Sequence, residues 1–217
     1  MGLRKSLNLL PCLSDYPCMT EDYAPTTRRR PVLPGREALL DEWLVTRIWS
    51  GDREAARLLA ERWQPRLART ARRLLGEEEA ALAAVQDSWL AILRGMTSLS
   101  DPARFPAWAF TILRRRCADA IGRRQAARSR DGGLAEDLPL PAQSCDSDER
   151  LAILQAFAAL PSDQRLAAQL HFVEGLSLAE IAEVQAVPTG TVKSRLFHAR
   201  RKLKAALSEP QLEGEHP

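Results

Sequence analysis

The chain has 217 residues, of which 45% are hydrophobic, 27% charged and 6% aromatic, and it carries a formal net charge of +3. This length suits one or two hydrophobic cores, and the low aromatic content favours an all-α fold over one that contains sheets. No apolar run approaches the roughly 18 residues of a membrane span, so we expect a cytoplasmic protein without membrane insertion.

Residues 1–36 contain Pro, Thr, Arg and Gly without helical periodicity, and we expect them to form a disordered N-terminal extension. Periodic apolar residues then predict a helical domain over residues 37–125. In its first helix, four apolar residues share one face: Leu40, Trp43, Leu44 and Ile48. Asp52 is placed to cap a second helix, which Pro65 kinks or restarts and which Gly76 ends.

Two more helices complete this predicted domain. The third carries five apolar residues at helical spacing: Leu82, Val85, Trp89, Leu93 and Met96. After a loop over residues 97–104, the fourth helix is predicted to turn three side chains inward: Phe105, Trp108 and Ile112. The chain then changes from basic to acidic, because residues 131–149 contain six acidic residues and no basic one. With its Gly, Pro and Ser residues, the segment 126–147 is predicted to be a flexible acidic linker.

A second small helical domain is predicted over residues 148–207, with a tail at 208–217. The segment Pro161-Ser162-Asp163 is predicted to end one helix and cap the next. The sequence Ser177-Leu-Ala-Glu180 is a capping box, in which each side chain accepts a hydrogen bond from the backbone amide of the other residue. A short turn, QAVPTG, separates this helix from a last one, so the domain is predicted to contain a helix-turn-helix.

The last helix has one apolar face and one strongly basic face. At 100° per residue, the predicted core stripe consists of Val192, Leu196, Ala199, Leu203 and Leu207. Residues 188–207 contain six basic residues and no acidic one, and these lie away from the stripe. A helix that is buried on one side and polycationic on the other fits the major groove of DNA. The alternative is a solvated basic helix at the end of a bundle.

The sequence offers no catalytic constellation and no metal site. Its four cysteines, Cys12, Cys18, Cys117 and Cys145, form no CxxC pair, and zinc-site spacing is absent. Free thiols are expected, with a redox pair of Cys12 and Cys18 as the alternative. A Gly-rich phosphate loop and a nucleophile elbow are also missing. We therefore expect a protein that is not an enzyme and needs no cofactor.

Two parts of the chain resemble conserved regions of bacterial RNA polymerase sigma factors. The stretch LSLAEIAEVQAVPTGTVKSRLFHARRKL is similar to region four, which binds the minus-thirty-five promoter element. The stretches AALAAVQDSWLAILRG and FPAWAFTILRRRCADAIGRR resemble region two, which binds the polymerase clamp and the minus-ten element. The short chain resembles the extracytoplasmic-function class of this family. At the turn of the helix-turn-helix, Gln185-Ala186 stands where the family usually has Leu-Gly.

The resemblance implies a sigma factor that binds core RNA polymerase and promoter DNA and directs promoter-specific transcription initiation, with an anti-sigma factor as a further candidate partner. Its minus-thirty-five contacts are expected from Lys193, Ser194, Arg195, Phe197, His198, Arg200 and Arg201. Among these, Arg195 and Arg200 lie at the flanks of the helical wheel and are expected to hold phosphates. Phe197 is expected to contact a thymine methyl group.

The resemblance also assigns residues to region two. Those expected to face the minus-ten element are Arg115, Asp119 and Arg123, and those expected to bind core polymerase are Gln86, Asp87 and Leu90. Three aromatic residues, Phe105, Trp108 and Phe110, are candidates for stacking on an unpaired base, although helical spacing places Trp108 in the core.

Two other functions remain open on the sequence. One is a stand-alone helix-turn-helix regulator, which would bind DNA as a symmetric dimer without polymerase. The other is a sigma-like module that binds an anti-sigma protein without reading promoters. The polar face around Gln86 and Asp87 favours the sigma factor over the first alternative, and the basic face over residues 193–204 disfavours the second.

Overall fold

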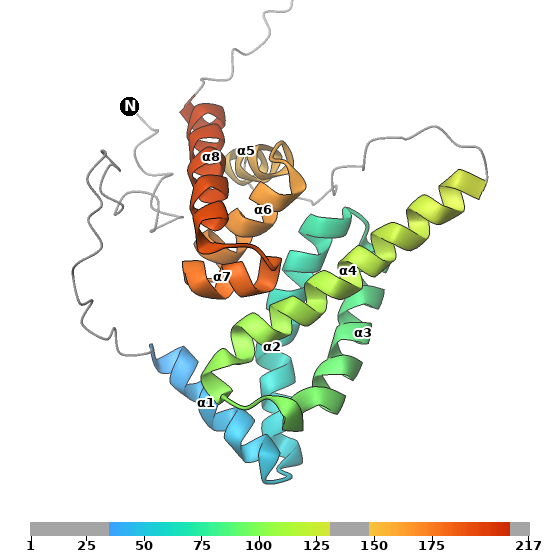
Figure 1. Cartoon of the computed structure of the whole chain (residues 1–217), viewed down its shortest axis with the longest axis vertical. Helices are drawn as coiled ribbons and strands as arrows, with labels where there is room; N and C mark the ends of the chain where they lie inside the picture. The colour runs from blue at the N-terminus through green and yellow to red at the C-terminus, as the bar shows by residue number, and fades with distance from the viewer. Residues whose placement is uncertain (1–34, 131–147, 209–217) are drawn as a thin grey trace, which may run out of the picture.

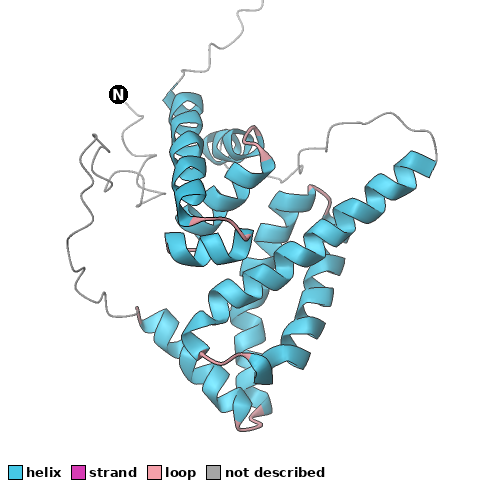
Figure 2. Cartoon of the chain, viewed as in Figure 1, coloured by secondary structure: helices cyan, strands magenta, loops and turns pink. Residues whose placement is uncertain are grey.

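The structure, a computed structural model, describes residues 35–130 and 148–208. The N-terminal half consists of α1 (Arg36–Trp49), α2 (Arg53–Leu75), α3 (Glu78–Gly95) and α4 (Phe105–Arg130), with the 3₁₀ turns η2 (Met96–Ser98) and η3 (Pro102–Arg104) between the last two. The C-terminal half consists of α5 (Asp148–Ala158), α6 (Ser162–Ala168), the π-helical turn η4 (Gln169–Val173), α7 (Leu178–Gln185) and α8 (Thr189–Ser208). Figure 2 shows that every regular element in the described ranges is helical, which confirms the predicted all-helical fold.

Several predictions concern residues outside these ranges. The N-terminal extension 1–36 falls outside them except for its last two residues, as do most of the linker 126–147 and all but the first residue of the tail 208–217. Helix α4 continues to Arg130, past the predicted domain end at residue 125. Its C-terminal end projects beyond the other helices (Figure 1).

Local signals in the sequence set both ends of α2. The Asp52 carboxylate accepts hydrogen bonds from the backbone amides of Glu54 and Ala55, as an N-cap residue should. Gly76 ends the helix in the left-handed conformation, with φ 71, which glycine adopts at little cost. Pro65 lies inside the helix without dividing it, so the predicted restart at this residue is wrong.

The core of the N-terminal half is centred on an aromatic cluster. Trp63 is 0% exposed, and its ring centroid lies 5.0 Å from that of Phe105 and 5.7 Å from that of Phe110. These edge-to-face and tilted arrangements stabilise aromatic pairs beyond their buried area. Cys117 is also buried, and burial raises the pKa of its thiol to about 12, so the thiol stays neutral and unreactive.

Two of the predicted core stripes are wrong in part. On α1, Leu40 and Trp43 are exposed and Val45 is buried instead. On α3, Leu82 and Leu93 are exposed and Ile92 is buried instead. Both helices lie at the edge of the bundle, so each buries only a narrow stripe, and neighbouring helices decide which of several apolar faces is covered.

The C-terminal half packs directly on the N-terminal half. Figure 1 shows α6 and α7 against α2 and α4, and one buried apolar cluster contains Leu67 and Leu113 as well as Leu170 and Ile181. A second, smaller cluster lies between α5, α6 and α8 and contains Phe157. The chain therefore folds as two helical domains, as predicted, but with a shared core.

We expect Ala186→Gly to stabilise the helix-turn-helix. Ala186 is exposed and ends α7 with φ 54 and ψ 47, a left-handed conformation that costs an L-residue about 1–2 kcal/mol. Glycine removes this cost but adds freedom to the unfolded chain, so the net gain in the free energy of unfolding should be about 0.5–1 kcal/mol. Urea unfolding followed by circular dichroism measures it. The control Ala83→Gly, at an exposed interior position of α3, should instead lose about 1 kcal/mol. A loss at both positions would contradict the prediction.

Candidate nucleic-acid interface

The helix-turn-helix begins with the predicted capping box. The Ser177 hydroxyl accepts a hydrogen bond from the Glu180 amide at 3.3 Å, and the Glu180 carboxylate accepts one from the Ser177 amide at 2.7 Å. Leu176 and Ile181 are both buried on either side of this cap. The start of α7 is thus fixed by the first residues of the motif.

Helix α8 buries the first four residues of the predicted stripe and exposes most of the basic face, while the side chain of Leu207, the fifth, lies outside the described residues. Val192, Ala199 and Leu203 are at most 1% exposed, and Leu196 is 8% exposed. The exposed residues around the rest of the helix include Lys193, Ser194, Phe197, His198, Arg201, Lys202 and Lys204. Phe197 is 45% exposed, and its ring lies edge-on to that of His198 at 5.5 Å. A large apolar side chain among cations and open to solvent is suited to contacting the edge of a base.

Arg195 differs from its neighbours because it has partners within the protein. Its guanidinium donates to the Gln185 side-chain oxygen at 2.7 Å and pairs with the Asp163 carboxylate at 2.5 Å. The side chain is only 20% exposed. Asp163 lies in the first turn of α6, but no side chain caps the start of this helix, so the predicted cap is absent. Arg195 therefore connects α8 to α6 and α7. Its predicted contact with a phosphate stays a prediction.

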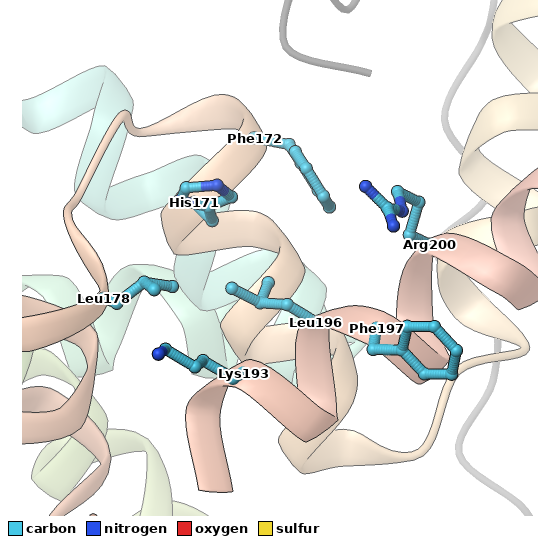
Figure 3. Close-up of a pocket in the computed structure, with 7 residues that line it drawn as sticks. All are labelled: His171, Phe172, Leu178, Lys193, Leu196, Phe197 and Arg200. Carbon is cyan, nitrogen blue, oxygen red and sulfur yellow. The ribbon is translucent and has the colours of Figure 1, made fainter. Parts of the chain in front are cut away.

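A pocket lies beside the basic face, between η4, α7 and α8 (Figure 3). Figure 3 shows Phe172 and Arg200 on one side and Leu178 with Lys193 on the other. Leu196 and Leu178 give the pocket an apolar lining, and the cations Lys193 and Arg200 lie at its edge. Arg200 is half-buried at this edge, whereas Arg201, the next residue on α8, is exposed.

Helix α4 exposes the three residues predicted to face the minus-ten element. Arg115, Asp119 and Arg123 are all exposed, and Asp119 lies 3.7 Å from Arg116 in an ion pair within the same helix. The face of α4 that they share carries more positive than negative charge, as contact with a phosphate backbone requires.

The aromatic residues near this face are arranged differently from the prediction. Phe105 is 0% exposed and Phe110 is 1% exposed, so the prediction that either stacks on a base is wrong. Both rings pack on Trp63, which the sequence could not indicate. Trp108 is half-buried and packs against the core, as predicted, and it also lines a cavity formed with the η2–η3 loop, together with Ser98, Ser100, Arg104 and Thr111. Sequence reasoning also missed Arg104, which pairs with Glu183 of α7 at 2.7 Å.

Helix α3 exposes the three residues predicted to bind polymerase. Gln86, Asp87 and Leu90 all lie on its solvent face. Leu82, Leu90 and Leu93 are 41%, 52% and 54% exposed, so this face is unusually apolar for a surface helix. Trp89 is half-buried and donates a hydrogen bond to the Gln64 side chain at 2.6 Å, which fixes α3 to α2. The exposed face has the composition of a protein-binding surface.

Within the ranges that the structure describes, no group of His, Cys, Asp and Glu side chains could hold a metal ion. None of the described helices is both long and apolar enough to cross a membrane. The site residues predicted from the sequence lie on three helices of the described ranges, α3, α4 and α8.

Two protein-family models match the parts of the chain that form these helices. The models for Sigma-70 region 2 and Sigma-70, region 4 match residues 59–127 and 150–203. The ECF RNA polymerase sigma-E factor of Salmonella typhimurium is 31% identical over 180 residues, which cover 77% of this chain and 94% of that protein.

Two solved structures share the fold. The sigma factor RpoE from Bartonella quintana, in complex with the anti-sigma factor NepR, has a TM-score of 0.61 and 27% identity, over 71% of this chain and 98% of that one. CnrH in complex with the cytosolic domain of CnrY has a TM-score of 0.57 and 27% identity, over 77% of this chain and 97% of that one.

Proposed function

The chain belongs to the extracytoplasmic-function class of RNA polymerase sigma factors, and from this premise we propose which of its surfaces bind polymerase and promoter. As a sigma factor it is not an enzyme; it directs transcription initiation by RNA polymerase. In our proposal α3 docks on core polymerase, α4 and the η2–η3 loop handle the minus-ten element, and α8 reads the minus-thirty-five element.

The observation that carries this proposal is the division of α8 into two faces. Its apolar stripe is buried against α5, α6 and α7, and its opposite face presents cations with no acidic residue in the whole helix. A capped helix and a tight turn precede it, which is how a recognition helix is held in the major groove. Lys193, Ser194, His198 and Arg201 are placed to reach base edges, and Arg200 to reach a phosphate.

On α4, we assign Arg115, Asp119 and Arg123 to the minus-ten element and add Trp108. Trp108 lines the cavity beside the η2–η3 loop, so an unpaired base entering that cavity would find an aromatic surface. A base stacked on an aromatic side chain contributes about 1–3 kcal/mol to binding. Phe105 and Phe110 have no part in this contact because both are buried.

The remaining assignments concern the linker and a second partner. We propose that the acidic segment 131–147 joins the two domains and separates them on polymerase, with its negative charge suited to a channel built for a polyanion. Because the two related structures above were solved with an anti-sigma factor and with the cytosolic domain of CnrY, we also propose that this chain binds a protein regulator of that kind.

Run-off transcription with purified core polymerase tests the function as a whole. A promoter library is transcribed by core polymerase with and without the protein, and promoter-specific transcripts are expected only when the protein is added. A stand-alone regulator would instead bind its sites without polymerase. Specific DNA binding by the protein alone, together with no gain in specific transcripts, would contradict the proposal.

We expect Gln86→Ala combined with Asp87→Arg to weaken binding to core polymerase about tenfold, which is about 1.4 kcal/mol. Both residues lie on the exposed face of α3, and the substitutions remove a polar contact and reverse a charge. Pull-down titration with core polymerase measures the affinity. The control Glu37→Arg, a charge reversal at an exposed site on α1, should leave it unchanged. Equal affinity of the double variant and wild type would remove α3 from the proposed interface.

A further inference from the structure

The contact between the two domains contains a buried charge that neither domain satisfies alone. Glu174 lies between η4 and α7, and its side chain is 0% exposed. Arg66 of α2 donates from Nε to one carboxylate oxygen at 2.9 Å, and from a terminal nitrogen to the Glu174 carbonyl oxygen at 2.9 Å. Arg69, one turn further along α2, donates to the other carboxylate oxygen at 3.0 and 3.2 Å.

The surroundings complete this network. Gln169 donates to the same carboxylate oxygen that Arg69 contacts, at 2.9 Å, and lies 3.5 Å from the Thr70 hydroxyl. The Arg66 guanidinium also lies over the Trp63 ring, 4.0 Å from its centroid, so it is held on α2 before the domains meet. A carboxylate enclosed in this way depends on its cations, because an unpaired buried charge is strongly destabilising.

A second interdomain pair covers the loop assigned to the minus-ten element. Arg104 of η3 pairs with Glu183 of α7 at 2.7 Å, and Glu183 forms one wall of the cavity that Trp108 lines. Glu183 of α7 therefore borders this cavity while the domains are in contact. Both residues are at least half exposed, so this pair is the weaker of the two.

The closed arrangement does not match the spacing of a bipartite promoter. Elements at minus thirty-five and minus ten are about 25 base pairs apart, or about 85 Å at 3.4 Å per base pair. Here α8 packs on α7, which itself packs on α4, so the two DNA-reading faces are separated by about two helix diameters, or about 20–25 Å. The 17 residues from 131 to 147 can span at most about 60 Å, which leaves enough chain for the domains to separate.

We propose that Glu174, held by Arg66 and Arg69, is a latch that keeps the free protein closed, and that the latch must open before both promoter elements can be engaged. The closure itself rests only on the interdomain contacts; its effect on promoter binding rests on the proposed function. The latch makes core polymerase compete with an intramolecular contact, so weakening it should raise the apparent affinity for polymerase.

Energy transfer between two dyes on the full chain tests the latch without polymerase or DNA. The dyes are placed at Glu37→Cys on α1 and Ala205→Cys on α8, both exposed, in a background where Cys12, Cys18 and Cys145 are serine. Cys117 stays, because its buried thiol does not react. Arg66→Ala combined with Arg69→Ala should lower the ratio of closed to open molecules at least tenfold. The control Arg57→Ala, whose partners Glu54 and Glu61 lie on its own helix, should not change it.

A charge-reversal experiment distinguishes opening of the domains from loss of folding. Glu174→Arg should open the domains, and adding Arg66→Glu and Arg69→Glu to it should restore most of the energy transfer, which a loss of folding could not do. Energy transfer equal to wild type in both the double alanine variant and Glu174→Arg overturns the latch. Opening without any change in affinity for core polymerase keeps the latch and counts against the proposed function.

Discussion

Replacing Trp63 with alanine is expected to lower the free energy of unfolding of the N-terminal domain by about 3–5 kcal/mol. The indole is completely buried and touches Phe105 and Phe110, so its removal leaves a cavity that two rigid rings cannot fill. It also removes the surface on which Arg66 lies. A loss of this size is a large fraction of the 5–15 kcal/mol that stabilises a typical domain.

Urea unfolding of the full chain, followed by circular dichroism, measures this loss. The matched control is Trp43→Ala, which removes the same side chain from a position on α1 that is 55% exposed and should change stability by less than about 1 kcal/mol. Arg47 lies near the Trp43 ring at 5.8 Å, but an exposed contact of this kind contributes little. Equal losses from the two variants would mean that Trp63 is not the centre of the core.

Replacing Arg201 with alanine is expected to weaken binding of the holoenzyme to its minus-thirty-five element by about 1–3 kcal/mol. The variant should also lose preference for particular bases at the positions that Arg201 contacts. Arg201 is exposed and lies opposite the buried Val192 stripe, where a long side chain reaches furthest into a groove. Arg200→Ala should act differently, because Arg200 lies at the flank. The variant should weaken binding to all DNA sequences alike and reduce the slope of log affinity against log salt concentration by about 0.9.

A base-by-base binding scan of the holoenzyme, repeated at several salt concentrations, separates the two effects. Arg57→Ala removes the same charge from α2 and should change neither preference nor salt slope. Arg195→Ala should mainly destabilise the helix-turn-helix, since its guanidinium is bound to Asp163 and Gln185. The same uniform loss from Arg200→Ala and Arg201→Ala, with base preference unchanged, would show that the face opposite Val192 does not read bases.

Much of the proposed DNA surface could be predicted because its signals are local. The Ser177–Glu180 capping box joins residues three positions apart, and Asp52 caps amides two and three positions away. The stripe of α8 could be read from periodicity because three helices pack on one side of it and leave the other side to solvent. Most of its basic residues lie on the exposed face, since burying an unpaired cation is costly, whereas Arg195 is partly buried with Gln185 and Asp163 as its partners.

The sequence by itself therefore determined the helices, the caps of α2 and α7 and the two faces of α8, since these depend on residues within one or two helical turns of each other. Only the tertiary structure decided which apolar faces of α1 and α3 are covered, that Trp108 rather than Phe105 borders the cavity, and that Arg195 is held by Asp163. It also brought Arg66 to Glu174, across 108 positions of chain. Helical periodicity carries no information about such pairs, because their free energy depends on how whole helices pack and on the burial that packing creates.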